Sequence, residues 1–495
     1  YKRQGKEITT GTYNNIIGGL AGDALTTGGF NVAMGYAALG AEDTGSRNVA
    51  IGHSALTALN YDGAGYNIAI GYNAGTAVTT GTNNTLVGGL AGDSITSGQH
   101  NVALGYNALA GEDAHGRNIA IGTNALAVQD AGADAYNIAI GHNAGLAVST
   151  GINNVLIGGL AGDDITTGNY NVAIGYRALQ AEDTHGRNVA IGYNSLATLN
   201  AGADAYNVGV GFKAGEAITT GILNTLVGGL VGDALTDGNE NTAIGYAALT
   251  SETRGDRNVA IGNSALSTQN NTSDVDAYNT AIGYAAGQSV TTGVENTIIG
   301  GLAGDALTTG SGNTAVGYEA LSTEDAHGKN TAFGFNTLRI LDAGADGYNT
   351  AVGYQAGLAI NTGVRNSILG YAARTLTTGS ENVAIGYLTM NAGTTGGKNV
   401  AVGTEALTSN LLGSRNVAVG QEALKAFVAG GGDNTYNTAV GFGAGIAVTN
   451  GVQNTLIGGL TGDAITEGSN NIVIGYNAAA SAVDVDNTTV IGTTT

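Results

Sequence analysis

The sequence is an internal repeat with a period of 17 residues that covers nearly the whole chain. Aligned on an asparagine, successive units read NVAMGYAALGAEDTGSR at 31–47, NVALGYNALAGEDAHGR at 101–117 and NVAIGYRALQAEDTHGR at 171–187. Counted from Asn14 to Asn487, there are 28 such starts. Repeats of this kind form stacked arrays, in which each unit buries its apolar residues against its neighbours.

A second period of 70 residues lies above the first, because units of 17, 17, 19 and 17 residues form a set. The opening unit carries Gly-Gly-Leu-Ala-Gly-Asp or a close variant, and the third carries a long loop, Ala-Gly-Ala-Asp at 131–134 and 201–204. This loop grows by two residues within 258–278, and the set that starts at Asn366 has five units and 88 residues. Insertions confined to one place in the unit indicate a surface loop.

Each unit contains a strand pattern and a turn pattern. In Asn-Val-Ala-Ile-Gly-Tyr, large and small residues alternate, which is the period of a strand with both faces covered. Val102 and Leu104 point to one face, and Ala103 and Gly105 to the other. The later Thr-Thr-Gly cluster predicts a turn. We therefore predict an all-β chain, a parallel β-solenoid or β-roll of about 28 coils of 17 residues with the 70-residue higher repeat.

This fold divides the chain into three parts. Residues 14–486 are the solenoid repeat array. Residues 1–13 are expected to form a partial coil that joins an upstream domain, and residues 487–495 a terminal partial coil leading to a C-terminal domain. Open sheet edges at solenoid ends need such caps.

Composition excludes several classes of protein. Of 495 residues, 85 are glycine and none is proline, cysteine or tryptophan, and only 11% are charged, unlike an ordinary globular enzyme or collagen. The hydrophobic content of 43% argues against disorder. No apolar run is long enough for membrane insertion, and the net charge of −21 argues against a nucleic-acid partner.

The repeated asparagine predicts a ladder, in which each side-chain amide donates to a carbonyl of the next coil and fixes the register. A residue present in every coil is better explained by stacking than by recognition. The ladder is expected at Asn31, Asn48, Asn67, Asn84, Asn101, Asn118, Asn137 and Asn154.

The third position of the unit predicts an association face. It is alanine in most coils, as at Ala33, Ala103 and Ala120, so one strand face is nearly flat, and flat apolar faces usually mark interfaces. Larger residues recur there in the opening unit of each set and are expected to lock the register between chains. They are Ile16, Leu86, Leu156, Leu226, Ile298, Ile368 and Leu456.

The Asn-x-Ala-Ile-Gly motif followed by a small residue resembles the head repeats of trimeric autotransporter adhesins. The longer Asn-Thr-Ala-Ile-Gly-Tyr with Thr-Thr-Gly loops resembles repeats of bacteriophage tail fibres, and the resemblance covers residues 14–492. In adhesin heads such coils form a left-handed parallel β-roll with three chains about a threefold axis, which is what the resemblance implies here. The longer coils of this chain favour the phage-type fibre. The closing segment at 486–492 is similar to one that precedes a self-cleaving chaperone domain in tail-fibre relatives.

No residue set predicts catalysis, a cofactor or a metal site. His115, His185 and His327 lie several coils apart and cannot share one metal ion, so solvated loop histidines are expected. Adjacent acids such as Glu112 and Asp113 are followed by Arg117, which predicts an exposed ion pair within the loop. Pairs of this kind end in Arg47, Arg187 and Lys329 in other coils.

Three further patterns have structural interpretations. The aspartate that ends Gly-Gly-Leu-Ala-Gly-Asp recurs only every fourth coil, which favours turn capping over calcium binding. The tyrosines that precede the asparagine are expected to cover the base of the long loop, with contact to glycans or another fibre as the alternative. They are Tyr13, Tyr66, Tyr136, Tyr206, Tyr278, Tyr348 and Tyr436. Threonine pairs at turns do not form the flat array that ice binding needs.

The sequence therefore predicts a non-enzymatic structural protein. The expected role is the homotrimeric shaft or head of a viral tail fibre or attachment appendage, on the virion surface or outside the cell. Its expected partners are a host-cell surface glycan or protein receptor and neighbouring fibre or virion proteins. The alternatives are a bacterial trimeric surface adhesin, and a self-assembling extracellular filament or an ice-binding solenoid, neither of which would need a trimer.

Overall fold

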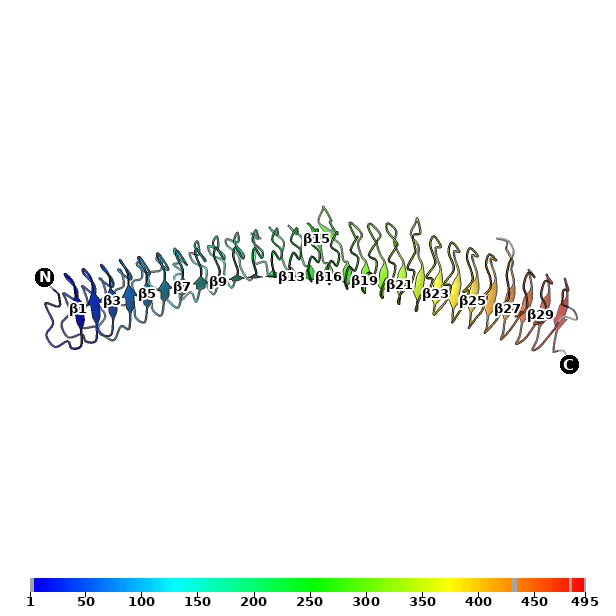
Figure 1. Cartoon of the computed structure of the whole chain (residues 1–495), viewed down its shortest axis with the longest axis horizontal. Coiled ribbons are helices and arrows are strands. Elements are labelled where there is room, and N and C mark those ends of the chain that lie inside the picture. The colour runs from blue at the N-terminus through cyan, green and yellow to red at the C-terminus, as the bar shows by residue number, and fades with distance from the viewer. Residues whose placement is uncertain (1–3, 430–433, 480–482, 494–495) are drawn as a thin grey trace. The chain divides into compact units, whose positions relative to one another are not determined.

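The computed structural model describes residues 4–429, 434–479 and 483–493. Over these residues the chain is all-β, with no helix, and forms a parallel β-solenoid of about 28 turns, as predicted. It divides into two compact units, Tyr1–Thr242 and Ala243–Thr495. Each unit is a stack of coils in which one short strand per coil builds the sheet (Figure 1).

The strands of the first unit are β1 (Asn15–Ile17), β2 (Val32–Met34), β3 (Val49–Ile51), β4 (Ile68–Ile70), β5 (Thr85–Val87), β6 (Val102–Leu104), β7 (Ile119–Ile121), β8 (Ile138–Ile140), β9 (Val155–Ile157), β10 (Val172–Ile174), β11 (Val189–Ile191), β12 (Val208–Val210) and β13 (Thr225–Val227). The strand β14 (Thr242–Ile244) falls at the boundary between the units.

The strands of the second unit are β15 (Gly255–Asp256), β16 (Val259–Ile261), β17 (Val275–Asp276), β18 (Thr280–Ile282), β19 (Thr297–Ile299), β20 (Thr314–Val316), β21 (Thr331–Phe333), β22 (Thr350–Val352), β23 (Ser367–Leu369), β24 (Val383–Ile385), β25 (Val400–Val402), β26 (Val417–Val419), β27 (Thr438–Val440), β28 (Thr455–Ile457), β29 (Ile472–Ile474) and β30 (Thr489–Ile491). The short strands β15 and β17 pair with each other beside the enlarged loop predicted within 258–278.

Neighbouring strands within each unit pair in parallel with equivalent residues side by side. Between β6 and β7, Val102 is opposite Ile119 and Ala103 is opposite Ala120. The N–H of Val102 donates to the carbonyl of Asn118 at 2.8 Å, and the N–H of Gly105 donates to the carbonyl of Val87 at 2.8 Å. Each coil is therefore bonded to the coils on both sides of it.

Besides the first-position asparagine, four side chains fill the interior of a coil. In the coil that begins at Asn101 these are Ala103, Ala108, Leu109 and Glu112, all fully buried. They occupy the third, eighth, ninth and twelfth positions after counting the asparagine as the first. The third residue thus lies inside the coil, and the residues on either side of it in the strand point outward.

The third and ninth core positions are matched in size: in most coils where the third residue is large, the ninth residue is glycine. Leu86, a third-position residue, is next to Gly75 and Gly92, which both occupy the ninth position of their coils. A β-carbon on Gly75 would lie 2.7 Å from Leu86 Cδ1, and one on Gly92 would lie 2.8 Å from Leu86 Cδ2. The same arrangement surrounds Leu156. In these opening coils the large residue therefore fills the space left by two glycines, whereas Ile368 has one such neighbour, Gly357.

Left-handed residues turn the chain at the end of each strand. Asn107 and Leu109 have φ angles of 57° and 50°, and Arg117 has a φ of 63° before the next coil begins. Gly105, with φ at 141°, brings two coils into backbone contact, because a β-carbon there would lie 2.5 Å from the carbonyl oxygen of Gly122. That close approach requires glycine at this position.

The last coil begins one residue later than the sequence repeat suggests. The N–H of Thr488 donates to Asn471 Oδ1 at 2.9 Å, so Thr488 takes the place of the repeated asparagine and Asn487 precedes it. Asn487 has a φ of 56°. All the preceding coils also end in a residue with this left-handed backbone conformation.

Candidate functional site

The repeated asparagines form a buried ladder of hydrogen bonds. In the coil that begins at Asn84, Nδ2 donates to the carbonyl of Gly98 at 2.8 Å, and Oδ1 accepts the backbone N–H of Asn101 at 3.0 Å. The eight asparagines from Asn31 to Asn154 named above are fully buried. Oδ1 of each asparagine therefore accepts a backbone N–H of the next coil, and Nδ2 donates to a backbone carbonyl in seven of the eight and to Glu112 Oε2 at Asn118. The link to the next coil is made by Oδ1 and not by the amide donor as predicted, and none of these eight side chains is accessible to a ligand.

The association face predicted at the third position is wrong. Ala33, Ala103 and Ala120 are fully buried inside their own chain. So are the larger residues Leu86, Leu156, Leu226, Ile298 and Leu456, while Ile368 is 2% exposed and Ile16 is half-buried. Alternation along a strand shows that there are two faces, but in this chain the small face is the interior, where the glycines of the ninth position leave room for the larger residues.

The outward strand face carries the apolar surface instead. We use this name for the first and last residues of the 28 three-residue strands, such as Val102 and Leu104 in β6. Most are Val, Ile, Leu or Thr, and none is charged. Leu104 is 44% exposed and Ile68 39%. The last residues of the strands therefore form a continuous row of half-buried to exposed apolar side chains from coil to coil within each unit.

Aromatic side chains border this face at the sixth position of the coil. Tyr176, Tyr193 and Phe212 stack on each other with ring centroids 5.6 and 5.5 Å apart. A longer column in the second unit has neighbouring centroids 5.3 to 6.0 Å apart. It consists of Tyr318, Phe335, Tyr354, Tyr371 and Tyr387. These rings widen the apolar surface along one edge of the outward strand face.

The tyrosines that precede the asparagine contact cations of the adjacent coil. The guanidinium carbon of Arg187 lies 5.7 Å from the ring of Tyr170 and 5.6 Å from that of Tyr206. Tyr206 is 51% exposed, and its cover of the loop base stays a prediction. Arg117 and Tyr136 form the equivalent contact at 5.5 Å.

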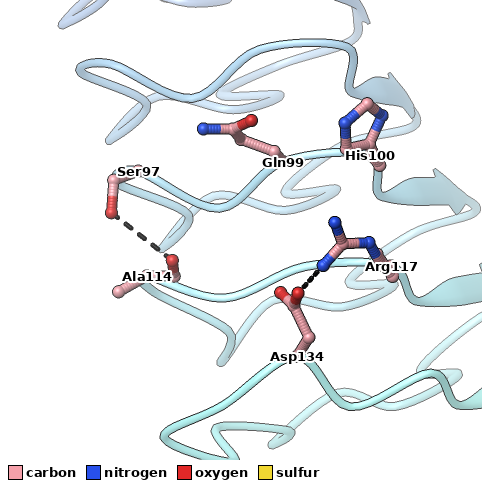
Figure 2. A pocket seen from close by; sticks show the side chains of 6 residues that line it. All are labelled: Ser97, Gln99, His100, Ala114, Arg117 and Asp134. Atoms are coloured by element: carbon pink, nitrogen blue, oxygen red, sulfur yellow. Dashed lines mark hydrogen bonds and ion pairs between the residues drawn. The ribbon is translucent and has the colours of Figure 1, made fainter.

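The basic residues do not pair with the acids of their own loop. Arg117 forms an ion pair with Asp134 of the following coil, and Arg187 does so with Asp204. Lys329 pairs with Asp346 in the same way. Figure 2 shows Arg117 pointing to Asp134 in a shallow pocket that is also lined by Ser97, Gln99, His100 and Ala114. The predicted pairing within the loop is therefore wrong, because the first acid of each pair is buried.

Five glutamates occupy the twelfth position, where most other coils have Leu, Ile or Val, and they are fully buried. They are Glu42, Glu112, Glu182, Glu252 and Glu324. Burial raises the pKa of Glu42, Glu112, Glu182 and Glu324 above the usual value of a glutamate. Backbone N–H groups oppose this effect, as where the N–H of Gly45 donates to Glu42 Oε1 at 2.6 Å. Sequence reasoning placed these carboxylates at the surface, since acid next to acid is typical of solvated loops.

The three loop histidines are not brought together. Each instead lies beside the buried glutamate of its own coil, with Nδ1 of His115 and His185 both 3.9 Å from the nearer glutamate oxygen and Nδ1 of His327 3.5 Å away. The spacing Glu-Asp-x-His in three coils is the sequence signal that could have identified this contact.

The aspartate of the opening coil is also partly buried. Burial, together with the adjacent Asp164, raises the pKa of Asp163 to about 6. Its Oδ1 makes no hydrogen bond within the described residues, and the same holds for Asp23 and Asp305. Successive members of these three aspartates lie eight coils apart, so no two of them face one ion.

No protein-family model matches the sequence, and no curated protein matches it. Within the described residues there is no helix that is long and apolar enough to cross a membrane.

Proposed function

We propose that this chain is the structural shaft or head of a viral tail fibre or related attachment appendage, in which three copies associate and present a tip that binds a host receptor. Its role is mechanical rather than enzymatic. The receptor is a surface glycan or protein of the host cell, and neighbouring fibre or virion proteins join the ends of the array.

The observation that carries this proposal is the uncharged outward strand face on an acidic chain. The chain has 38 acidic and 17 basic residues, yet none of them occupies the first or last position of a three-residue strand. Copies with a net charge of −21 repel one another wherever their loops meet. The outward strand face is the surface on which they can approach, and exposed apolar surface of this extent marks an interface.

A second copy of the same chain suits this face better than an unrelated partner. The surface repeats with every coil, so a neighbouring copy at the same height presents equivalent rows of Val, Ile and Thr along the whole array. Cyclic assemblies of identical chains bury such repeated surfaces around their axis. The proposed axis therefore lies against residues such as Leu104 and Ile121, and not against Ala103 or Ala120.

Light scattering of the native chain tests the proposal. We expect a mass of three times 48.8 kDa. Leu104→Glu combined with Ile121→Glu places charge on the outward strand face and should dissociate the assembly. Thr80→Glu combined with Thr150→Glu adds the same charge at exposed turn residues and should leave the mass unchanged. A native mass of one chain would contradict the trimer and favour the filament alternative.

A further inference from the structure

Three coils place a glutamate, an aspartate and a histidine around one point. The groups are Glu112, Asp113 and His115; Glu182, Asp183 and His185; and Glu324, Asp325 and His327. In each group, one carboxylate oxygen from each acid and one ring nitrogen lie within 4.8 Å of one another. Asp130 of the following coil joins the first group. The repeat thus builds the same cluster three times within the described residues.

Each cluster has a buried side and a partly exposed side. The glutamates are fully buried, and Oε1 of Glu112 and of Glu182 accepts the backbone N–H of the histidine at 3.1 and 3.2 Å. The histidine side chains are about one-third exposed, at 32%, 30% and 31% in chain order. A buried carboxylate therefore forms the floor of the cluster, and the imidazole and the aspartate form its rim.

Polar atoms in these clusters lack hydrogen-bond partners. Oε2 of the fully buried Glu182 makes no hydrogen bond among the described residues. Nδ1 of His115 and Nδ1 of His327 are also buried and make none there. Buried polar atoms are nearly always satisfied, so an orphaned carboxylate oxygen and two orphaned ring nitrogens in equivalent clusters indicate a ligand that accepts electron pairs.

The two coils that lack the histidine give an internal comparison. Glu42 has Gly45 in the histidine position, and its Oε1 and Oε2 accept N–H groups of Gly45 and Tyr61 at 2.6 and 3.3 Å. Glu252 has Gly255 there, and its Oε2 accepts the side-chain amides of Gln269 and Asn271 at 2.8 and 3.1 Å. In both coils the protein itself satisfies both oxygens of the buried carboxylate. It does so in two of the histidine clusters as well, where Oε2 of Glu112 accepts Nδ2 of Asn118 at 3.4 Å and Oε2 of Glu324 accepts the N–H of Ala343 at 3.3 Å. The unpaired carboxylate oxygen is therefore confined to the second cluster, at Glu182.

We propose that the three Glu-Asp-His clusters bind divalent transition-metal ions of the zinc class, one ion in each cluster and three in each chain. Carboxylate oxygen with imidazole nitrogen is a ligand set typical of zinc, whereas calcium takes oxygen ligands alone. Ligands held tetrahedrally about 2.1 Å from an ion lie ~3.4 Å apart. The rim aspartate and histidine reach that spacing by rotation of partly exposed side chains.

The clusters should differ in affinity. The first has a fourth protein ligand in Asp130 and a free Nδ1 on His115, so it binds most tightly. In the second, the hydroxyl of Thr184 lies 2.9 Å from Nδ1 of His185. This contact has to break before Nδ1 can bind an ion. Bound ions would tie the loop to the core of its coil and leave the outward strand face unaltered.

Calorimetric titration of the full, chelator-treated chain with Zn²⁺ near neutral pH tests the proposal. We expect three ions per chain and none for the triple variant His115→Gln, His185→Gln and His327→Gln. The matched control replaces the other three histidines, His53, His100 and His142, with glutamine and should retain three ions. Each single variant within the clusters should lose one ion. Substitution with Co²⁺ should give visible absorption that the triple variant lacks.

Two results would overturn the assignment. One is native chain that takes up no Zn²⁺ under these conditions. The other is a triple variant that binds as many ions as the native chain, which would place the binding on other surface acids. Circular dichroism of the triple variant checks that the solenoid is intact, and the single variants give the same answer if it is not.

Discussion

Leu86 occupies the space that a β-carbon on Gly75 would fill, since the two atoms would lie 2.7 Å apart. This pairing of a large third residue with a ninth-position glycine recurs in every opening coil from Leu86 to Leu226. It explains why the 70-residue repeat exists at all. One coil in four has its large core residue at the third position and glycine at the ninth. The coil before it also has glycine at the ninth position, which leaves room for the large residue.

Leu86→Ala should destabilise the first unit by about 2–5 kcal/mol, because the glycines on both sides leave no side chain to fill the cavity. Leu411→Ala is the matched control, since Leu411 is 39% exposed. Its effect should stay within about 0.5 kcal/mol. Denaturant unfolding measures both. Equal losses for the two variants would contradict the core position of Leu86.

Asn154→Ala should cost about 1–3 kcal/mol, because it leaves two buried backbone groups without partners. Nδ2 of Asn154 donates to the carbonyl of Gly168, and Oδ1 accepts the N–H of Asn171, both at 2.9 Å. The exposed Asn60→Ala serves as control and should have little effect. Hydrogen exchange would locate the loss at the coils that flank Asn154, and uniform exchange along the unit would argue against the ladder.

The variants Gly105→Ala and Gly132→Ala distinguish the stability cost of a close backbone contact from the cost of a positive φ angle. Both glycines have positive φ, 141° and 65°. A β-carbon on Gly105 meets the carbonyl of Gly122, whereas one on Gly132 meets nothing within 4 Å. We expect Gly132→Ala to cost about 1–2 kcal/mol and Gly105→Ala to cost clearly more. Thermal melting of the two variants compares them, and a smaller loss for Gly105→Ala would rule out the close contact between coils.

Stability should fall as pH rises from about 4 to 6, in part because of Asp163. Its pKa is about 6 in the folded chain, against 3.8 as the reference value. The folded state therefore binds more protons in this window, and stability falls as pH rises through it. Partial exposure limits the effect to under about 1 kcal/mol. Asp163→Asn should flatten the pH profile of the melting temperature, while the exposed Asp274→Asn should not.

Much of the fold could be predicted from the 17-residue spacing. The period sets the number of coils, and the alternation in Asn-Val-Ala-Leu-Gly at 101–105 locates the strand and its two faces. Which face is inside depends on what fills the opposite wall of the coil. That information lies in the ninth position, where Leu109 alternates with glycines such as Gly92, and it emerges only when the third and ninth positions are read together.

The positions of the charged loop residues were harder to predict, because charged side chains usually lie in solvent. Glu112 occupies the same core position as Ile95 of the preceding coil, and only the fixed spacing from the asparagine reveals this equivalence. Its burial then brings His115 against it. The partner of Arg117 could not be found within its own repeat, because Asp134 belongs to the longer loop of the following coil.

The hydrogen bonds that join β6 to β5 and β7 run along the direction in which the coils are stacked. Tension applied along that direction loads the interfaces between coils in series, so each carries the full force. The force at which a unit ruptures is then set by its weakest interface and not by the number of coils. Such an array can gain reach by duplication of a set without losing tensile strength.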